Sequence, residues 1–250
     1  QIEAMPEPWL MYVAINAPHI PTHVPPAELV TVVVDANSTR TQKYEAALEA
    51  ADTELGRLLD AIDPMVLADT TVILMSDNGT PGDFIEAPWD PDRAKATLYE
   101  AGVNVPLIVT GPLLHGVTGE SRAFIDIADV FATVGEITGF PVDDSIDGIS
   151  FLPLLQHPEQ PGERDHIIVD RFLSNGPPPY TTDQWMIRDE NYKLMWFAPS
   201  TENFFDMTGR DVEGDVLDLD NLTDVQRENY ERLWALLLDE QGRRTYEYSD

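Results

Sequence analysis

The sequence predicts an α/β fold that is followed by a small α+β region. An apolar run, a long amphipathic segment and a second apolar run come in the order strand, helix, strand, which is the order of a parallel crossover unit. From residue 184 onward, short apolar runs alternate with turn residues, which is typical of antiparallel strands. We therefore expect an α/β core, a mostly parallel sheet flanked by helices, over residues 1–165, and a small antiparallel-sheet and helix subdomain over residues 166–250.

The first elements follow from the spacing of apolar residues. Residues 9–15 (WLMYVAI) and residues 70–76 (TTVILMS) are continuous apolar or β-branched runs, so both are expected to be buried strands. Between them, residues 38–62 place apolar side chains three or four positions apart, as on one face of a helix. The side chains expected on that face are Tyr44, Leu48, Ala51, Leu55, Leu58, Leu59 and Ile62.

The later elements follow from the same rules and from capping signals. Residues 105–110 (VPLIVT) are expected to form a short strand, and residues 126–138 a helix with Gly139 as its C-terminal cap. The apolar side chains of that helix are Ile127, Val130, Phe131, Val134 and Ile137. The remaining expected elements are a strand at 166–170, short strands within 184–189, 191–198 and 203–207, and a last helix at 224–240 with Thr223 or Asp224 as its N-cap.

The composition excludes several classes of protein. The formal charge of −30 disfavours nucleic acid as a partner, and no apolar run approaches the ~20 residues of a membrane-spanning helix. The chain contains no cysteine, which excludes disulfides, thiolate metal sites and a cysteine nucleophile within it. The acidic residues are expected to form a solvated surface, although a local cluster could hold a hard cation such as calcium.

Two oxygen-bearing side chains directly follow the second apolar run. Asp77 and Asn78 come after residues 70–76, and the carboxyl end of a strand is where α/β proteins place ligand groups. Both side chains are hard oxygen donors that suit Ca²⁺ or Mg²⁺. An Asx turn is the alternative, because Asp-Asn-Gly is also good turn chemistry.

Two basic side chains lie in loops near these strands. His19 follows residues 9–15 between prolines, where it could bind an anion or donate a proton to a leaving group. Lys95 lies in the long loop 79–97, and its ammonium could contact a tetrahedral oxyanion. Each residue taken alone is more often an ordinary surface side chain.

Taken together, these residues and several motifs occur in one order along the chain. The motifs are WLMYVAINAPHIP, YEAALEAADTELGRLL, SDNG, Lys95 with TLYEAGVNVPLIVTGP, FIDIADVFATVGEITGFP, SIDGISFLPLL, RDENYKLMWF and NFFDMTGRDVEGDVLDL. In this order they resemble the sulfatase family of the alkaline-phosphatase superfamily over nearly the whole chain. The resemblance implies an alkaline-phosphatase-like sulfatase core, present here in part, with a C-terminal subdomain.

The resemblance also implies a role for each candidate residue. Asp77 and Asn78 would be calcium ligands, with Mg²⁺ as the alternative ion, and Lys95 would contact the sulfate oxygens. His19 would bind the sulfate or protonate the departing alcohol oxygen. Phosphodiesterase relatives commonly have His after this Asp and bind two transition metals, so the carboxamide of Asn78 favours one hard ion.

The sequence departs from the family pattern in one major respect and two minor ones. It contains neither a cysteine nor a Ser-x-Pro-Ser-Arg string, so it lacks the residue that sulfatases oxidise to a formylglycine nucleophile. It also lacks the pair of Asp ligands that the family supplies from its N-terminal half. Ala101 replaces the first Gly of E-G-G, and Asn104 stands where the family usually has Arg. We therefore expect the chain to be the C-terminal portion of a sulfatase.

These inferences predict a sulfuric ester hydrolase that cleaves a sulfate monoester with the help of calcium. Its partners would be a sulfated small molecule or glycan and the missing N-terminal half of the same enzyme, which would carry the formylglycine. The chain alone is expected to be inactive, and export to the periplasm or outside the cell is favoured. The alternatives are a phosphate or phosphonate ester hydrolase of the same superfamily and a non-catalytic sulfatase-like binding module.

Overall fold

A computed structural model of the 250-residue chain describes all residues except 1–7, 88, 144, 174–181, 199 and 244–250. The chain divides into two compact units. One comprises Gln1–Ile73 with Val109–Leu113, and the other comprises Leu74–Ile108 with Leu114–Asp250. The expected domain boundary at residue 165 falls inside the second unit and stays a prediction. Among the described helices, none has both the length and the apolar character needed to cross a membrane.

The long helix of the first unit is confirmed, and of the seven side chains on its expected apolar face one, Leu48, is exposed while the others are buried or partly buried. Helix α1 (Arg40–Asp60) begins at a capping box, in which Thr39 and Gln42 satisfy each other's backbone N–H groups. A second, short helix, α2 (Pro64–Ala68), follows. The buried side chains of α1 are Ala46, Ala47 and Ala50, whereas Leu48 is 53% exposed. The prediction that Leu48 faces the core is therefore wrong within the described residues.

The expected strand at residues 9–15 is wrong. These residues have no strand partner in the described chain, and Leu10, Tyr12, Val13 and Ile15 are all exposed. A strand requires a neighbouring ladder to satisfy its backbone N–H and C=O groups, and the sequence pattern cannot supply that neighbour. A run of apolar residues was therefore not sufficient evidence for a strand at this position.

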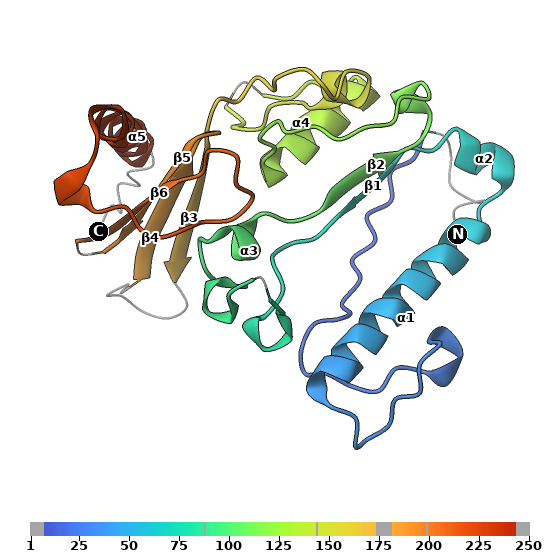
Figure 1. Ribbon diagram of the computed structural model, residues 1–250. Coiled ribbons are helices and arrows are strands. Elements are labelled where there is room, and N and C mark those ends of the chain that lie inside the picture. The colour runs from blue at the N-terminus through green and yellow to red at the C-terminus, as the bar shows by residue number, and fades with distance from the viewer. Residues whose placement is uncertain (1–7, 88, 144, 174–181, 199, 244–250) are drawn as a thin grey trace, which may run out of the picture. The chain divides into compact units, whose positions relative to one another are not determined.

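The two expected strands beside the candidate ligands are confirmed. Strands β1 (Val72–Met75) and β2 (Leu107–Thr110) form a two-stranded sheet, with the short helix α3 (Glu100–Val103) between them in the chain (Figure 1). Loop residues between β1 and α3 form two 3₁₀ turns, Gly82–Phe84 and Pro91–Arg93. This arrangement carries both the Asp-Asn pair and Lys95.

Helix α4 (Ile127–Thr138) is confirmed, with Asp126 as its N-cap and Gly139 in the left-handed conformation after its last residue. Its buried side chains are Asp129, Ala132 and Thr133, whereas Ile127 and Phe131 are 64% and 56% exposed. Of the five expected apolar side chains, Ile127, Phe131 and Ile137 are thus exposed, whereas Val130 and Val134 are partly buried. The face of α4 that carries Asp129 and Thr133 is buried instead. These two side chains accept hydrogen bonds from the backbone N–H groups of Ile149 and Phe151.

The expected antiparallel sheet is also confirmed. Its strands pair in the order β3-β4-β5-β6, and helix α5 lies against the sheet (Figure 1). Thr223 and Gln226 form a capping box at the start of α5. The bounds are β3 (Ile167–Leu173), β4 (Thr182–Arg188), β5 (Tyr192–Phe197), β6 (Thr201–Asp206) and α5 (Asp224–Arg243).

Both faces of this sheet are covered. On one face, Ile187, Leu194 and Phe204 pack against Leu233 and Leu237 of α5, and all five side chains are 0% exposed. On the other face, a second apolar cluster contains Met186, Met195 and Phe205 of the sheet together with Leu98 and Met207. Leu98 belongs to the segment that carries Lys95, so the sheet packs directly against the candidate site's own loop.

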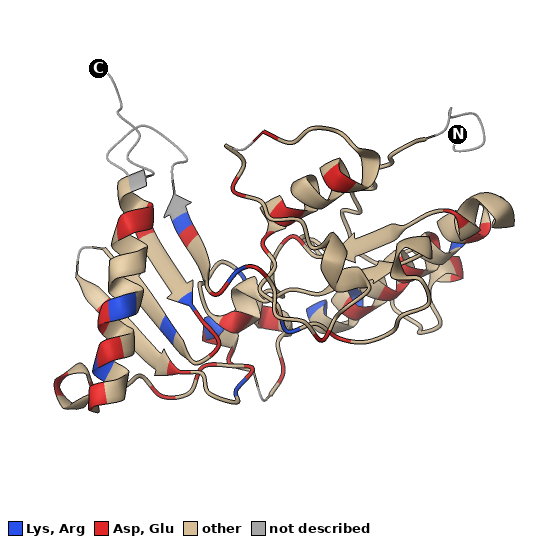
Figure 2. Cartoon of the chain, turned by 90° about the horizontal axis from the view of Figure 1, so that it is seen from above, with Lys and Arg blue, Asp and Glu red and all other residues tan. Residues whose placement is uncertain are grey.

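The acidic residues are spread over helices and loops of both units (Figure 2). Within the described residues, no group of three or more His, Asp or Glu side chains is arranged to hold a metal ion. The expectation that most of the negative charge is a solvated surface stays a prediction.

Candidate functional site

Asp77 and Asn78 are held at the end of β1 by backbone contacts of the residues on either side of them. The Ser76 N–H donates to Pro106 O at 3.3 Å, and the Gly79 N–H donates to Gly102 O at 3.0 Å. A Cβ atom on Gly79 would lie 1.9 Å from the carbonyl oxygen of Ala101, so only glycine fits this approach. The turn is therefore fixed against α3.

The Asx-turn alternative for Asp77 is not what the structure shows. In such a turn, the carboxylate would accept the backbone N–H two residues later, but the Gly79 N–H is used by Gly102. Asp63 and Asp90 do make this contact with Met65 and Asp92, at 2.8 and 2.9 Å. The Asp77 carboxylate is exposed and makes no hydrogen bond to another described residue.

Lys95 lies next to this turn. Its backbone N–H donates to Thr80 O at 3.0 Å, two residues after Asn78. The half-buried Lys95 ammonium makes no hydrogen bond or ion pair with any residue that the structure describes. Ala96 has a φ of +66°, a conformation that costs a non-glycine residue free energy and occurs often at functional sites. The structure thus brings the Asp-Asn turn and Lys95 together.

His19 belongs to the other unit and is exposed. Its Nδ1 atom lies 2.7 Å from the carbonyl oxygen of Ile20. A carbonyl oxygen only accepts hydrogen bonds, so Nδ1 carries the hydrogen in this contact. The Nε2 atom is consequently the ring nitrogen that can accept or give a proton. The part that His19 plays beside Asp77, Asn78 and Lys95 stays a prediction.

The donor set at the turn fits part of a calcium shell. The carboxylate of Asp77 and the carboxamide oxygen of Asn78 are hard donors, and neither side chain is engaged by another described residue. Calcium takes about six to eight oxygen ligands. The described residues therefore offer a partial site for one hard ion, and their role as ligands stays a proposal.

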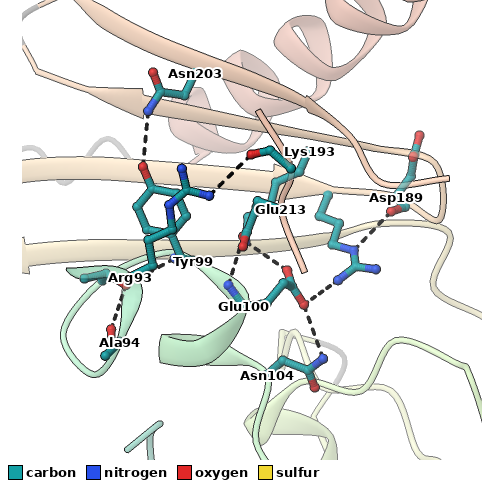
Figure 3. A network of polar contacts seen from close by, with 12 residues as sticks. Arg93, Ala94, Tyr99, Glu100, Asn104, Asp189, Lys193, Asn203 and Glu213 are labelled. Carbon is teal, nitrogen blue, oxygen red and sulfur yellow. Dashed lines mark hydrogen bonds and ion pairs between the residues drawn. The ribbon is translucent and has the colours of Figure 1, made fainter. Parts of the chain in front are cut away.

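The structure also contains a buried charge cluster that the sequence did not predict. It consists of Glu100 at the start of α3, Arg188 of β4, Lys193 of β5 and Glu213 (Figure 3). The signal in the sequence was a single lysine inside the apolar run NYKLMWF, where a charge requires a partner. Asn104, which replaces the usual Arg of the family pattern, donates to Glu100 Oε2 at 3.2 Å.

The close approach at Gly79 gives a test of this geometry. We expect Gly79→Ala to lower the free energy of unfolding by about 1–3 kcal/mol, because the new methyl group would force the Ala101 carbonyl to move. Chemical denaturation followed by far-UV circular dichroism measures the change. Gly56→Ala is the control: its Cβ would have nothing within 4 Å, so helix α1 should become slightly more stable. Equal midpoints for the Gly79 variant and the original chain would contradict the proposed packing.

Comparison with known proteins gives two family matches that together span most of the chain. The sulfatase family matches residues 1–140, and the C-terminal region of N-sulphoglucosamine sulphohydrolase matches residues 92–241. An uncharacterized sulfatase of Escherichia coli K12, YdeN, is 27% identical over 165 residues, which are 63% of this chain. The chain spans only 29% of the length of that relative.

Solved structures show the same fold. A protein in complex with its substrate, D-glucosamine-2-N,6-O-disulfate, superposes with a TM-score of 0.64 at 19% identity, over 84% of this chain and 43% of that one. The phosphonate monoester hydrolase of Agrobacterium radiobacter gives a TM-score of 0.59 at 25% identity, over 79% and 40%. With a family match over more than half of its residues, the chain belongs to the sulfatase family of the alkaline-phosphatase superfamily.

Proposed function

We propose that this chain supplies one side of the active site of a sulfuric ester hydrolase. The observation that carries the proposal concerns the Asp77 carboxylate and the Lys95 ammonium, neither of which bonds to another described residue. Their backbone segments are joined by the hydrogen bond from Lys95 N–H to Thr80 O. Opposite charges on joined backbone segments, neither of them bonded to a described residue, suit a ligand that contains both a cation and an anion, as a sulfate with a metal ion does.

Each residue has a distinct role in this proposal. Asp77 and Asn78 would hold Ca²⁺, with Mg²⁺ as the alternative, and the bound ion would offset negative charge on the sulfate group. The Lys95 ammonium would contact sulfate oxygens and stabilise the charge that develops on them. His19, through Nε2, would bind the sulfate or protonate the departing alcohol oxygen.

The remainder of the site would come from another part of the same protein. Sulfatases resembling this chain use a formylglycine nucleophile, and none of the 250 residues is a cysteine from which one could form. Exposed apolar side chains on and beside α4, namely Ile127, Phe131 and Phe140, are compatible with a covering protein segment. The substrate class we favour is a sulfated sugar, because one structural neighbour was solved with such a substrate. A periplasmic or secreted location stays a prediction.

The phosphonate monoester hydrolase among the structural neighbours favours a second candidate function. Phosphate and phosphonate esters share the tetrahedral oxyanion, so the same cation and lysine would serve them. A third candidate, a binding module without catalysis, has the same side chains and differs only in turnover.

Parallel assays test these candidates. We expect the complete protein, with its upstream region, to hydrolyse an aryl sulfate faster than an aryl phosphonate monoester, and the purified 250-residue chain to hydrolyse neither. Faster phosphonate hydrolysis would favour the second candidate. Failure of the complete protein on both esters, with sulfate binding retained, would favour the binding module. Turnover by the purified chain alone would contradict the incomplete site.

A further inference from the structure

We propose that the buried charge cluster, Glu100, Arg188, Lys193 and Glu213, is a positioning device for Lys95 and for the Asp-Asn turn. These four residues act through helix α3 rather than by touching a substrate. Whether this positioning serves catalysis rests on the proposed function. The coupling between the cluster and Lys95 is inferred from the contacts alone, and it can be measured without any substrate.

Each charged side chain of the cluster is paired with a side chain of opposite charge, and the four formal charges sum to zero (Figure 3). Lys193 Nζ donates to Glu100 Oε1 at 2.9 Å and to Glu213 Oε1 at 2.6 Å, and the three side chains are at most 3% exposed. Arg188 pairs with the other carboxylate oxygen of Glu100. Two carboxylates thus face two cations. Separating a buried charge from its partner costs several kcal/mol, so these four side chains have few other conformations available to them.

The cluster also holds the backbone of α3. The Glu100 N–H donates to Glu213 Oε1 at 2.9 Å, so the same carboxylate oxygen binds the first residue of the helix and the Lys193 ammonium. This N–H belongs to the first turn of α3, where no intrahelical acceptor is available. The position of α3 is therefore determined by side chains of the C-terminal sheet and of the segment that follows it.

Helix α3 in turn touches both parts of the candidate site. Gly102 O accepts the hydrogen bond from Gly79, next to Asn78. On the other side, a Cβ atom on Gly102 would lie 2.5 Å from Thr97 O and 2.7 Å from Ala94 O, so the helix packs without any gap against the segment that contains Lys95. A displacement of α3 would therefore move the turn and the Lys95 segment together.

Further contacts attach the Lys95 segment to the same C-terminal region. Leu98 is 2% exposed and packs among Met186, Met195 and Phe205 of the sheet. Arg93 Nη1 donates to Gly214 O at 3.3 Å. The segment therefore has a polar anchor before Lys95 and an apolar anchor after it, and the charge cluster adds a third anchor at α3.

The lysine content of the chain permits a direct test. The chain has three lysines, Lys43, Lys95 and Lys193, and no cysteine. Brief acylation with a substoichiometric N-hydroxysuccinimide ester, followed by peptide mass spectrometry, reports the reactivity of each ammonium. Lys43, in the other unit, is the internal reference. In Lys193→Met we expect the labelling rate of Lys95, relative to Lys43, to change by at least about threefold, because loss of the cluster loosens α3.

A matched control separates positioning from general destabilisation. Leu237→Ala removes a buried side chain on the opposite face of the sheet, against α5, and leaves every cluster contact in place. We expect it to destabilise the fold while the relative labelling of Lys95 stays within about 1.5-fold of the original value. An equal change in both variants, or an unchanged Lys95 in folded Lys193→Met, would overturn the proposal.

A milder variant keeps the test decisive if Lys193→Met does not fold. Glu213→Gln removes one charge but retains an acceptor for the Glu100 N–H and for Lys193. It should change Lys95 labelling in the same direction by a smaller factor, and an unchanged rate would again overturn the coupling. Protection of Lys95 by sodium sulfate with calcium, measured in the complete protein, tests the proposed function separately: absence of protection there would contradict the sulfate contact while the coupling result stands.

Discussion

Asp129→Ala is expected to lower the free energy of unfolding by about 3–5 kcal/mol, the largest stability loss we predict for a residue outside the candidate site. The Asp129 carboxylate is 1% exposed and accepts three hydrogen bonds: from Asp126 N at 2.7 Å, from Ile149 N at 2.7 Å and from Arg164 Nη2 at 2.6 Å. Removing it would leave the Arg164 charge and two backbone donors without acceptors. Unpaired buried donors cost about 1–3 kcal/mol each.

The neighbouring Asp126 is a control on the same helix. Its carboxylate accepts a hydrogen bond from Ala128 N at 2.9 Å as an N-cap, and Asp126→Ala should cost about 1 kcal/mol. Urea denaturation followed by far-UV circular dichroism compares the two variants. Equal losses would show that Asp129 is only a second cap and that its ion pair with Arg164 adds nothing measurable. A much larger loss for Asp129 would show that the buried pair joins α4 to the segments that follow it.

This region shows where sequence reasoning succeeds and where it stops. Local signals predicted α4 correctly, since the apolar spacing and the C-terminal Gly139 are read within the helix itself, although Asp126 proved to be its N-cap rather than its first residue. The exposed face was not predictable, because hydrophobic spacing gives the period of a helix and not the neighbour that covers it. Here the neighbour is a loop eighteen to twenty residues later, in which the backbone N–H groups of Ile149 and Phe151 donate to Asp129 and Thr133.

The same limit applies to the candidate site. Family motifs identified Asp77, Asn78 and Lys95, and the structure places the Asp-Asn turn beside the Lys95 segment through short-range backbone contacts. The charge cluster was missed because its partners are 93 and 113 residues apart in the chain. Only the folded sheet brings Lys193 to Glu100. The failed strand at residues 9–15 has a related cause, since these residues have no strand partner in the described chain and the sequence pattern does not reveal this.

Lys95→Ala in the complete protein is expected to lower kcat/KM for a sulfate ester by about 10²–10³-fold, the loss that follows removal of one oxyanion-stabilising donor. Stability should be almost unchanged, because the ammonium makes no hydrogen bond or ion pair with another described residue and only its backbone N–H holds Thr80. Steady-state kinetics on an aryl sulfate, together with thermal denaturation, measure both quantities.

Lys43→Ala is the matched control, because the Lys43 ammonium donates to Ala36 O, at 2.9 Å, and belongs to the first unit, whereas Lys95 belongs to the second. Its kcat/KM should stay within about twofold of the original value, since Lys43 has no part in the proposed site and its substitution breaks no buried contact. Lys95→Arg retains the charge but presents a planar fork instead of a point charge, so it should recover only part of the activity. An equal loss in Lys95→Ala and Lys43→Ala would mean that general charge, and not a contact from Lys95, attracts the sulfate. Full activity in Lys95→Ala would remove Lys95 from the proposed site.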